Sequence, residues 1–556
     1  MRIPGTAWLV LLLVAGCDSG TQPLVPPSED PVVSVVMGPE GTRLAEHGTA
    51  TIVVVCRDAQ GRVTSPRVVL WSSLDPQVAV LEAAPSGNNA MLRGIIPGEA
   101  RIVARVEDIR DTMTVTVTPL PVDHVTFERT LPDTQLLHAK GQVIAYAYAA
   151  DGLPVNRPIA YQSTRPDIAV VTADGHVDLV GTGRGGITAS AEGMSATDEF
   201  LVMSATFTAI TSGADHDCAI AASGQLWCWG AGSSGQLGIP VAWDQPTPVP
   251  SGGALRLAQV SAGWSHTCGL TAVGTAWCWG GNLFGEVGSG TATSPTYEPT
   301  AVATGLRFAN ISGGKFLTCG ADTQHAGQCW GSNNVLQLGS DVTGGNVPPM
   351  SDVPTRAIAD TSFVRLSAGE RNACGITTTG QAICWGDPSL GQTGGVAAGQ
   401  PVPGGYSFTD ISVGDAVVCG LTNTGVAVCW GNALFGATGD GGGNPSGSPA
   451  PVVGGLQFAQ LAAAHDFVCG LSAGRIYCWG NGSLGSLGNG TRDVERSPVP
   501  ISSDETFMAV SAGGFHACGL TTGGVIYCWG SRASIVGGLG DGGNGPSTVP
   551  VRIPGS

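Results

Sequence analysis

The chain has 556 residues, more than one domain needs, and its 85 glycines and 36 prolines without long helical patterns predict an all-β protein. Its formal net charge is −17, and lysine occurs only at positions 140 and 315. Charge of this sign argues against nucleic acid as a partner, because binding a polyanion needs a broad basic surface.

The N-terminus has the layout of a secretory signal peptide, with Arg2, an apolar run from Ala7 to Ala15, and Cys17. The string Leu13-Val14-Ala15-Gly16-Cys17 resembles the bacterial lipobox. This resemblance implies that residues 1–16 are removed and that Cys17 becomes the lipidated mature N-terminus. The alternative is an ordinary signal peptide with an incidental cysteine.

Residues 17–31 include four prolines among small polar residues and predict a flexible tether. Acyl chains on Cys17 would hold the body on a membrane, since each buried CH₂ adds about 0.8 kcal/mol. No other segment is long and apolar enough to span a bilayer. We therefore expect a bacterial cell-envelope protein, anchored on the periplasmic or the surface face.

Two strand-rich units follow, at residues 32–119 and 120–204. Trp71-Ser72-Ser73 in the first corresponds to Tyr161-Gln162-Ser163 in the second, 90 residues later. The pattern resembles the bacterial Ig-like domains of group 2, which implies two β-sandwiches acting as a stalk. The aromatic residue of each unit is expected to fill the core. Cys56, in an apolar strand-like run, is expected to be a buried free thiol.

The remainder of the chain carries seven cysteine pairs, and Trp-Gly follows the second cysteine of every pair. Successive first cysteines lie 45 to 55 residues apart, a period typical of propeller blades. Short strand-like runs around a glycine-bearing turn predict that each pair lies in a β-hairpin. The pairs are Cys218 and Cys228, Cys268 and Cys278, Cys319 and Cys329, Cys374 and Cys384, Cys419 and Cys429, Cys469 and Cys478, and Cys518 and Cys528.

Each pair is predicted to form a disulfide within its hairpin. Opposed residues on antiparallel strands have Cα atoms about 4.5 to 5.5 Å apart, which a disulfide can bridge. The shorter spacing from Cys469 to Cys478 is compatible if the turn, rather than a strand, is shortened. Zinc is the alternative, but one pair supplies only two of four ligands. Export also favours disulfides.

Each repeat contains Gly-x-x-His-x-Cys, Thr-x-x-Gly, Trp-Gly and Gly-Gln-Leu-Gly or variants of them, as in Gly263 to Gly288. These motifs resemble the repeats of the regulator of chromosome condensation family. The resemblance implies a seven-bladed β-propeller over residues 205–556. The paired cysteines depart from the family pattern, as export would require.

The two residues after the repeat glycine differ in every copy, whereas the hairpin turns are monotonous. If the first strand lines the axis, these residues form a ring around the mouth of the propeller, with exposed aromatic residues suited to bind a partner. The alternative is that they are unselected turn residues. The residues of the predicted ring are Asp215, Trp264, Lys315, Phe316, Glu370, Arg371, Asp415, His465, Asp466 and Phe515.

His216, His266 and His516 share one repeat position and would be neighbours in a closed ring, so a zinc site is one interpretation of them. Family resemblance favours a structural role in satisfying backbone groups. The loops Asp440–Asn444 and Asp541–Asn544 were considered for calcium, but their glycine content favours simple flexibility. No catalytic constellation is recognisable, and no cofactor or metal is expected.

The sequence therefore predicts a monomeric, non-catalytic binding module with a protein or glycan partner on the loop face. Guanine nucleotide exchange is an alternative by family analogy, but export removes a small GTPase as substrate. A polysaccharide lyase or hydrolase is a second alternative, and His465-Asp466 is the only sequence feature that supports it. An inhibitor of a secreted enzyme is a third.

Overall fold

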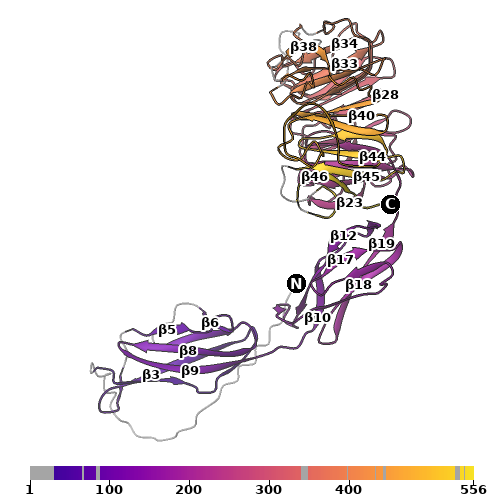
Figure 1. Cartoon of the computed structure of the whole chain (residues 1–556). Helices are drawn as coiled ribbons and strands as arrows, with labels where there is room; N and C mark the ends of the chain where they lie inside the picture. Colours follow the sequence, from indigo (N-terminus) through magenta and orange to yellow (C-terminus); the bar gives the residue numbers. More distant parts are fainter. Residues whose placement is uncertain are drawn as a thin grey trace. The chain divides into compact units, whose positions relative to one another are not determined.

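The structure, a computed structural model, describes residues 31–64, 68–82, 88–339, 349–396, 399–432, 434–442, 446–532, 539–543 and 545–555. These residues form 46 strands and no helix, which confirms the all-β prediction (Figure 1). Among them no helix could therefore cross a membrane. The predicted signal peptide and Cys17 lie outside the described residues.

The chain divides into two compact units. The first comprises the residues up to Thr126 together with Tyr146–Ile159 and Ala191–Met194, and the second comprises the rest. This division does not coincide with the predicted boundaries at residues 119 and 204, which stay predictions.

In the first unit, the residues up to Thr118 form two sheets around one core. Alternation along β3 buries Ile52, Val54 and Cys56, and Cys56 is a free thiol as expected. Trp71 packs against the same core. One sheet has the order β1(Ser34–Gly38), β3(Thr49–Arg57), β7(Asn89–Gly94) and β6(Ala79–Glu82), with β4(Val63–Thr64) paired to β3; the other has β2(Arg43–Ala45), β9(Ile109–Thr118), β8(Gly98–Val106) and β5(Leu70–Ser73).

The strands between residues 124 and 203 form three sheets. Tyr161 packs on a core that includes Ile168 and Phe200, and its hydroxyl accepts the backbone N–H of Ala145 at 2.9 Å. The sheets are β10(His124–Arg129), β13(Ile144–Tyr148) and β14(Pro154–Val155); β11(Thr134–Leu136), β19(Met194–Met203), β18(Gly183–Ala191) and β15(Ala160–Ser163); and β12(Lys140–Gln142), β17(His176–Leu179) and β16(Ala169–Val171).

From residue 207 onward, the described residues form seven antiparallel sheets in succession, here called propeller sheets 1 to 7. The first three are β20(Phe207–Ser212), β21(His216–Ala221), β22(Leu226–Gly230) and β23(Gln245–Ser251); β24(Gln259–Ala262), β25(His266–Leu270), β26(Ala276–Gly280) and β27(Thr296–Ala301); and β28(Phe308–Gly313), β29(Leu317–Asp322), β30(Gly327–Ser332) and β31(Met350–Arg356).

Sheet 4 has three strands, and the other three sheets have four. They are β32(Phe363–Ala368), β33(Asn372–Thr377) and β34(Ala382–Gly386); β35(Phe408–Val413), β36(Val417–Thr422), β37(Ala427–Gly431) and β38(Ser446–Pro451); β39(Gln460–Ala463), β40(Phe467–Ser472), β41(Arg475–Gly480) and β42(Glu495–Pro500); and β43(Phe507–Ala512), β44(His516–Thr521), β45(Ile526–Gly530) and β46(Ser547–Arg552).

The first strands of these sheets line a common axis. Each contacts the first strand of the next sheet, and β43 of sheet 7 contacts β20 of sheet 1. The sheets therefore close into a β-propeller. Every sheet is built from one continuous stretch of sequence, so no strand is shared between the first and last sheets. Closure depends on contacts between sheets.

The seven disulfides are present, as predicted. In each hairpin the two cysteines are direct partners, with Cα atoms 4.0 to 4.1 Å apart. The shorter sixth hairpin keeps this opposition because Ser472 pairs with Arg475 across a two-residue turn. All fourteen cysteines are buried.

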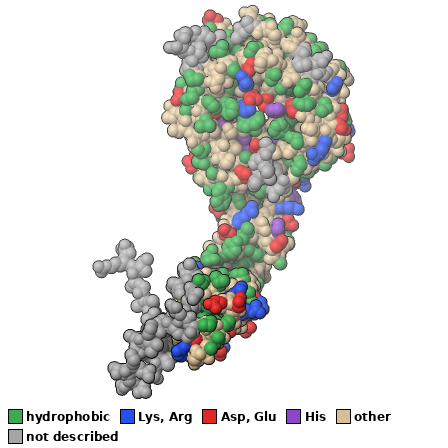
Figure 2. All heavy atoms as spheres, turned by 90° about the vertical axis from the view of Figure 1, so that its left-hand side faces the viewer, with side chains coloured by type: hydrophobic (Ala, Val, Ile, Leu, Met, Phe, Trp, Pro, Cys, Tyr) green, Lys and Arg blue, Asp and Glu red, His purple; other side chains and the backbone are tan. Residues whose placement is uncertain are grey.

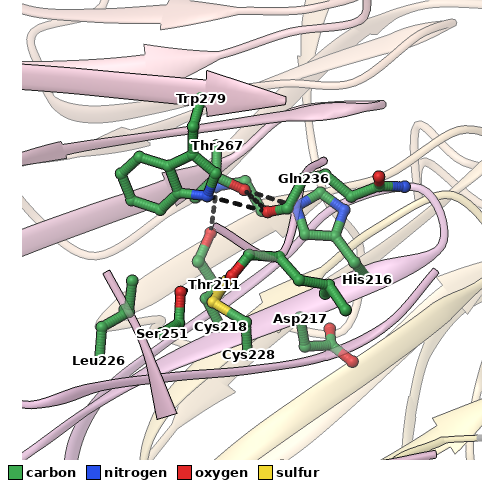
Figure 3. The surroundings of a disulfide bond; sticks show 12 residues. Thr211, His216, Asp217, Cys218, Leu226, Cys228, Gln236, Ser251, Thr267 and Trp279 are labelled. Carbon is green, nitrogen blue, oxygen red and sulfur yellow. Dashed lines mark hydrogen bonds between the residues drawn. A yellow bond between two sulfur atoms is a disulfide. The ribbon is translucent and has the colours of Figure 1, made fainter. Parts of the chain in front are cut away.

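The Trp-Gly and Gly-Gln-Leu-Gly motifs meet across sheet boundaries. Each motif tryptophan is fully buried, and its Nε1–H donates to a backbone carbonyl of the preceding sheet at 2.8 to 3.0 Å. Figure 3 shows Trp279 bonded in this way to Gln236, near the Cys218–Cys228 disulfide. A Cβ on the neighbouring Gly238, which has φ +66°, would lie 2.8 Å from Trp279 Nε1. The final glycine therefore permits the indole to approach.

Candidate binding face of the propeller

The predicted ring lies at the same end of the sheets as the connections between the third and fourth strands. In each of the seven sheets, the residue after Trp-Gly donates its backbone N–H to a carbonyl at the ring, at 2.7 to 3.0 Å. The accepting residue is the second of the two variable residues that follow the repeat glycine, whose place Ala464 takes in sheet 6. Examples are Gly281 to Ser265 and Asn481 to Asp466. This end of the propeller is called the mouth face below, and the hairpin turns lie at the opposite end.

A cavity of about 80 Å³ opens on the axis at the mouth face and is lined by all seven sheets. The repeat glycine of six sheets lies in its wall, and Ala464 takes this place in sheet 6. A Cβ on Gly263 would lie 2.4 Å from the carbonyl oxygen of Gly314 in the next sheet. The glycines are therefore required by the close approach of neighbouring sheets.

One layer deeper, hydroxyl groups from six sheets surround the axis. Each Oγ accepts a backbone N–H of the next sheet at 2.8 to 3.1 Å, and among the described residues none of these hydroxyls has a partner for its own hydrogen. The layer therefore bridges the sheets and leaves polar groups facing the axis. Its members are Thr211, Ser261, Ser312, Ser367, Ser412 and Ser511.

Lys315 is held in place by two neighbouring ring residues. Its Nζ contacts Glu370 Oε1 and lies 4.2 Å from the centre of the Trp264 ring, a cation–π arrangement. Both charged side chains are mostly buried, at 20% and 25% exposure. The positive charge of Lys315 is thus balanced within the face, and its ammonium group covers the Trp264 ring.

Across the cavity, Asp415 and Asp466 flank His465. The imidazole lies 4.0 Å from Asp415 Oδ2 and 3.8 Å from Asp466 Oδ2, and its ring packs on Phe515 at 5.1 Å. The contact with Asp466 raises the pKa of His465. Burial, and then the negative charge of Glu370, raise the pKa of Asp415 to about 6, well above its ordinary value.

The other ring residues lie further from the axis. Arg371 is exposed and pairs with Asp387 at 2.9 Å, while the carbonyl of Asp215 accepts from Arg532 at 3.3 Å. Phe316 packs edge-on against Phe284 of sheet 2 at 5.1 Å. The expectation of exposed aromatic residues is wrong, because Trp264, Phe316 and Phe515 are each half-buried by contacts within the face.

The three histidines bond to the next sheet rather than to backbone groups. His216 Nε2 lies 2.8 Å from Thr267 Oγ1, and His266 Nε2 lies 2.9 Å from Thr318 Oγ1. Each threonine in turn donates to a backbone carbonyl. Burial lowers the pKa of His216 to about 3 and that of His266 to about 4, so both are neutral. Figure 3 shows His216 beside Thr267.

Metal sites find no support among the described residues. The one group of three possible ligands is Asp217 with Cys518 and Cys528, and these cysteines are bonded to each other. Asp440 and Asp541 each accept the backbone N–H of the glycine two residues later, as in simple turns. Asn444 and Asn544 of the considered calcium loops lie outside the described residues.

Sequence reasoning missed an arc of exposed leucines on the mouth face. They lie in the connections that follow Trp-Gly in sheets 2 to 6. The number of residues between the motif tryptophan and the leucine varies by one or two among the copies. The local signal was a leucine in each of these glycine-rich connections. The arc, called the leucine arc below, consists of Leu283 at 70% exposure, Leu336 at 48%, Leu390 at 42%, Leu434 at 60% and Leu484 at 38%.

Figure 2 shows one side of the propeller, on which acidic, basic and histidine side chains gather near the centre with hydrophobic side chains around them. The contacts of the mouth face follow the same arrangement, with Lys315, Glu370, Asp415 and His465 near the axis. A charged centre with an apolar surround is suited to recognition of another molecule.

Two family models describe the repeats. Residues 223–270 and 473–520 match the regulator of chromosome condensation (RCC1) repeat, and residues 207–236, 257–286 and 363–392 match a second model of that repeat. The chain is 29% identical over 192 residues to human probable E3 ubiquitin-protein ligase HERC6, covering 33% of this chain and 19% of HERC6. It is 26% identical over 188 residues to the Arabidopsis thaliana ultraviolet-B receptor UVR8, covering 33% and 42%.

The chain thus spans less than half the length of either curated relative. Among solved structures, human WBSCR16 has a TM-score of 0.53 at 21% identity, covering 59% of this chain and 94% of its own. Prp20p from Saccharomyces cerevisiae has a TM-score of 0.53 at 19% identity, covering 63% and 87%. These likenesses support a propeller carrying RCC1 repeats.

Proposed function

We propose that this chain is a non-catalytic protein-binding module of a bacterial cell envelope. In this proposal a seven-bladed propeller is carried by two Ig-like domains on a lipid anchor at Cys17. The partner binds the mouth face. The observation that carries the proposal is the leucine arc around a compact charged centre.

The chemistry of the face favours a protein over a glycan. Exposed leucines such as Leu283 and Leu434 offer aliphatic surface, which a protein partner can cover with its own apolar side chains. Stacking on a sugar would need an open aromatic ring. Trp264 does not offer one on the side that Lys315 covers.

Seven buried disulfides support an exported location, because such bonds persist in oxidising compartments. The relatives include a probable E3 ubiquitin-protein ligase and an ultraviolet-B receptor, and this chain spans less than half the length of either protein. The shared element is the repeat, and its use as an interaction surface is what we carry over.

The test is differential capture from a native envelope fraction by the full-length protein. We expect a partner that wild type retains and that the double variant Leu283→Asp/Leu434→Asp loses. Trp264→Ala, Phe316→Ala and Phe515→Ala should each weaken binding by at least about 1 kcal/mol, because they support the face.

The matched control is Val273→Asp, since Val273 is 71% exposed in a hairpin turn at the opposite end. Thr378→Ala and Asn423→Ala, also exposed in hairpin turns, are further controls. If the hairpin variants lose the captured protein while the leucine variant retains it, the mouth face is the wrong surface.

A further inference from the structure

The charges around the mouth cavity do not balance. Lys315 is neutralised by Glu370, and Arg371 by Asp387. Asp466 accepts a hydrogen bond from Asn481 Nδ2 at 2.6 Å. By contrast, the Asp415 carboxylate accepts no hydrogen bond from any described residue, and its nearest cation is His465 at 4.0 Å.

Asp415 is also poorly hydrated. Its side chain is 15% exposed, and the residue lines the axial cavity. Burial and the charge of Glu370 oppose its ionisation. A positive group placed in the cavity would offset both effects, because its charge would favour the ionised carboxylate.

The cavity can accommodate the end of one extended side chain. Its volume is about 80 Å³, and six repeat glycines form part of its wall, together with larger side chains that include Trp264, Lys315 and His465. Beneath it lies the layer of six hydroxyl groups. An ammonium or guanidinium group has several N–H donors, and the carboxylate of Asp415, which lines the cavity, can accept a hydrogen bond from one of them.

The leucine arc lies at the same end of the sheets as this cavity. A partner residue that enters the cavity would therefore be flanked by segments that contact leucines such as Leu434, which is 60% exposed. The net charge of −17 would further favour a basic contact region in the partner.

We propose that the partner is a protein that inserts a lysine or arginine side chain into the axial cavity against Asp415, while apolar residues beside it pack on the leucine arc. This proposal rests on the protein-binding function above and specifies the chemistry of its partner.

The experiment uses a phage-displayed library of cyclic peptides selected on the full-length protein. We expect selected peptides to carry a lysine or arginine between apolar residues. For a synthetic lysine-bearing peptide, replacing the lysine with norleucine should lower the affinity for wild type at least tenfold. On Asp415→Asn the same replacement should have less than a threefold effect.

Leu434→Ala should weaken the peptide severalfold, and Val273→Ala should leave it unchanged. Binding to wild type should also weaken between pH 7.5 and pH 5, because the carboxylate of Asp415, whose pKa is raised to about 6, becomes neutral. The charged neighbours of Asp415 in this range are Glu370, Lys315, His465 and Asp466. Asp415→Asn should show a smaller pH effect.

Peptides that depend on Leu434 but carry no cation, or whose cation is insensitive to Asp415→Asn, would overturn this inference and leave the binding function standing. Selection of acidic peptides would also overturn the inference of a cationic side chain and would leave the binding function standing. If no selected peptide depends on either the leucine arc or Asp415, the proposed function fails as well.

Discussion

Asp217 carries a buried carboxylate at the junction between propeller sheets 7 and 1. It accepts from His516 Nε2 at 2.8 Å and pairs with Arg532, which is itself 2% exposed. Burial alone would raise its pKa, but the charges of His516 and Arg532 lower the pKa of Asp217 to about 2. The ionised pair thus joins the two ends of the repeat array.

Asp217→Asn should destabilise the propeller by about 3 to 5 kcal/mol, because it leaves the buried Arg532 charge uncompensated. Urea unfolding at pH 7 measures this. Since the pKa of Asp217 is lowered, its contribution is present above about pH 4 and is lost as pH falls toward 2. The difference between wild type and variant should shrink over that range.

The comparison for this prediction is Thr267→Val, at the junction between sheets 1 and 2. It removes two neutral hydrogen bonds of Thr267, one with His216 Nε2 and one to the carbonyl of Gln236, and we expect a cost of about 1 to 3 kcal/mol. Equal costs for the two variants would show that the Asp217 charge has no special part in closure.

At the scale of the element, the hairpin of each sheet combines a disulfide with a tryptophan that bonds to the preceding sheet. The disulfide links the second and third strands of the sheet. The indole N–H donates a hydrogen bond to the preceding sheet, and the facing glycine leaves room for the indole. Each hairpin is therefore fixed within its sheet and against its neighbour.

Closing a ten-residue loop stabilises the fold by about 2.5 to 3 kcal/mol in the chain-entropy model. Mass spectrometry of the exported, unreduced protein should find fourteen cysteines protected from alkylation. Cys56 should react only after unfolding, because it is a buried free thiol and burial raises its pKa. Seven or more reactive thiols in the folded protein would contradict the pairing in exported material.

For the whole molecule, the proposed lipid anchor at Cys17 would attach the protein to a membrane. We expect Cys17→Ser to release the protein from membranes in cell fractionation or to block its processing, because the acyl chains would be lost. Immunoblots of membrane and soluble fractions measure this. A Cys56→Ser variant is the control, and unchanged membrane association of Cys17→Ser would exclude lipidation.

Local spacing in the sequence determined the repeats, the opposed cysteines and the end of the sheets at which variable residues gather. The two cysteines of each pair are only 9 or 10 positions apart, and a hairpin brings such residues together whatever else the chain does. The prediction of the face therefore followed from comparing copies such as Trp264 and Lys315.

Only the tertiary structure decided which charges are balanced and which side chains are covered. Lys315 meets Glu370 from the next sheet, and His516 meets Asp217 across 299 residues. The side-chain carboxylate of Asp415 is left without a hydrogen bond among the described residues. Such pairings depend on ring closure, which no local pattern encodes. For the same reason the aromatic residues turned out half-buried and the leucines exposed, since packing between sheets sets exposure.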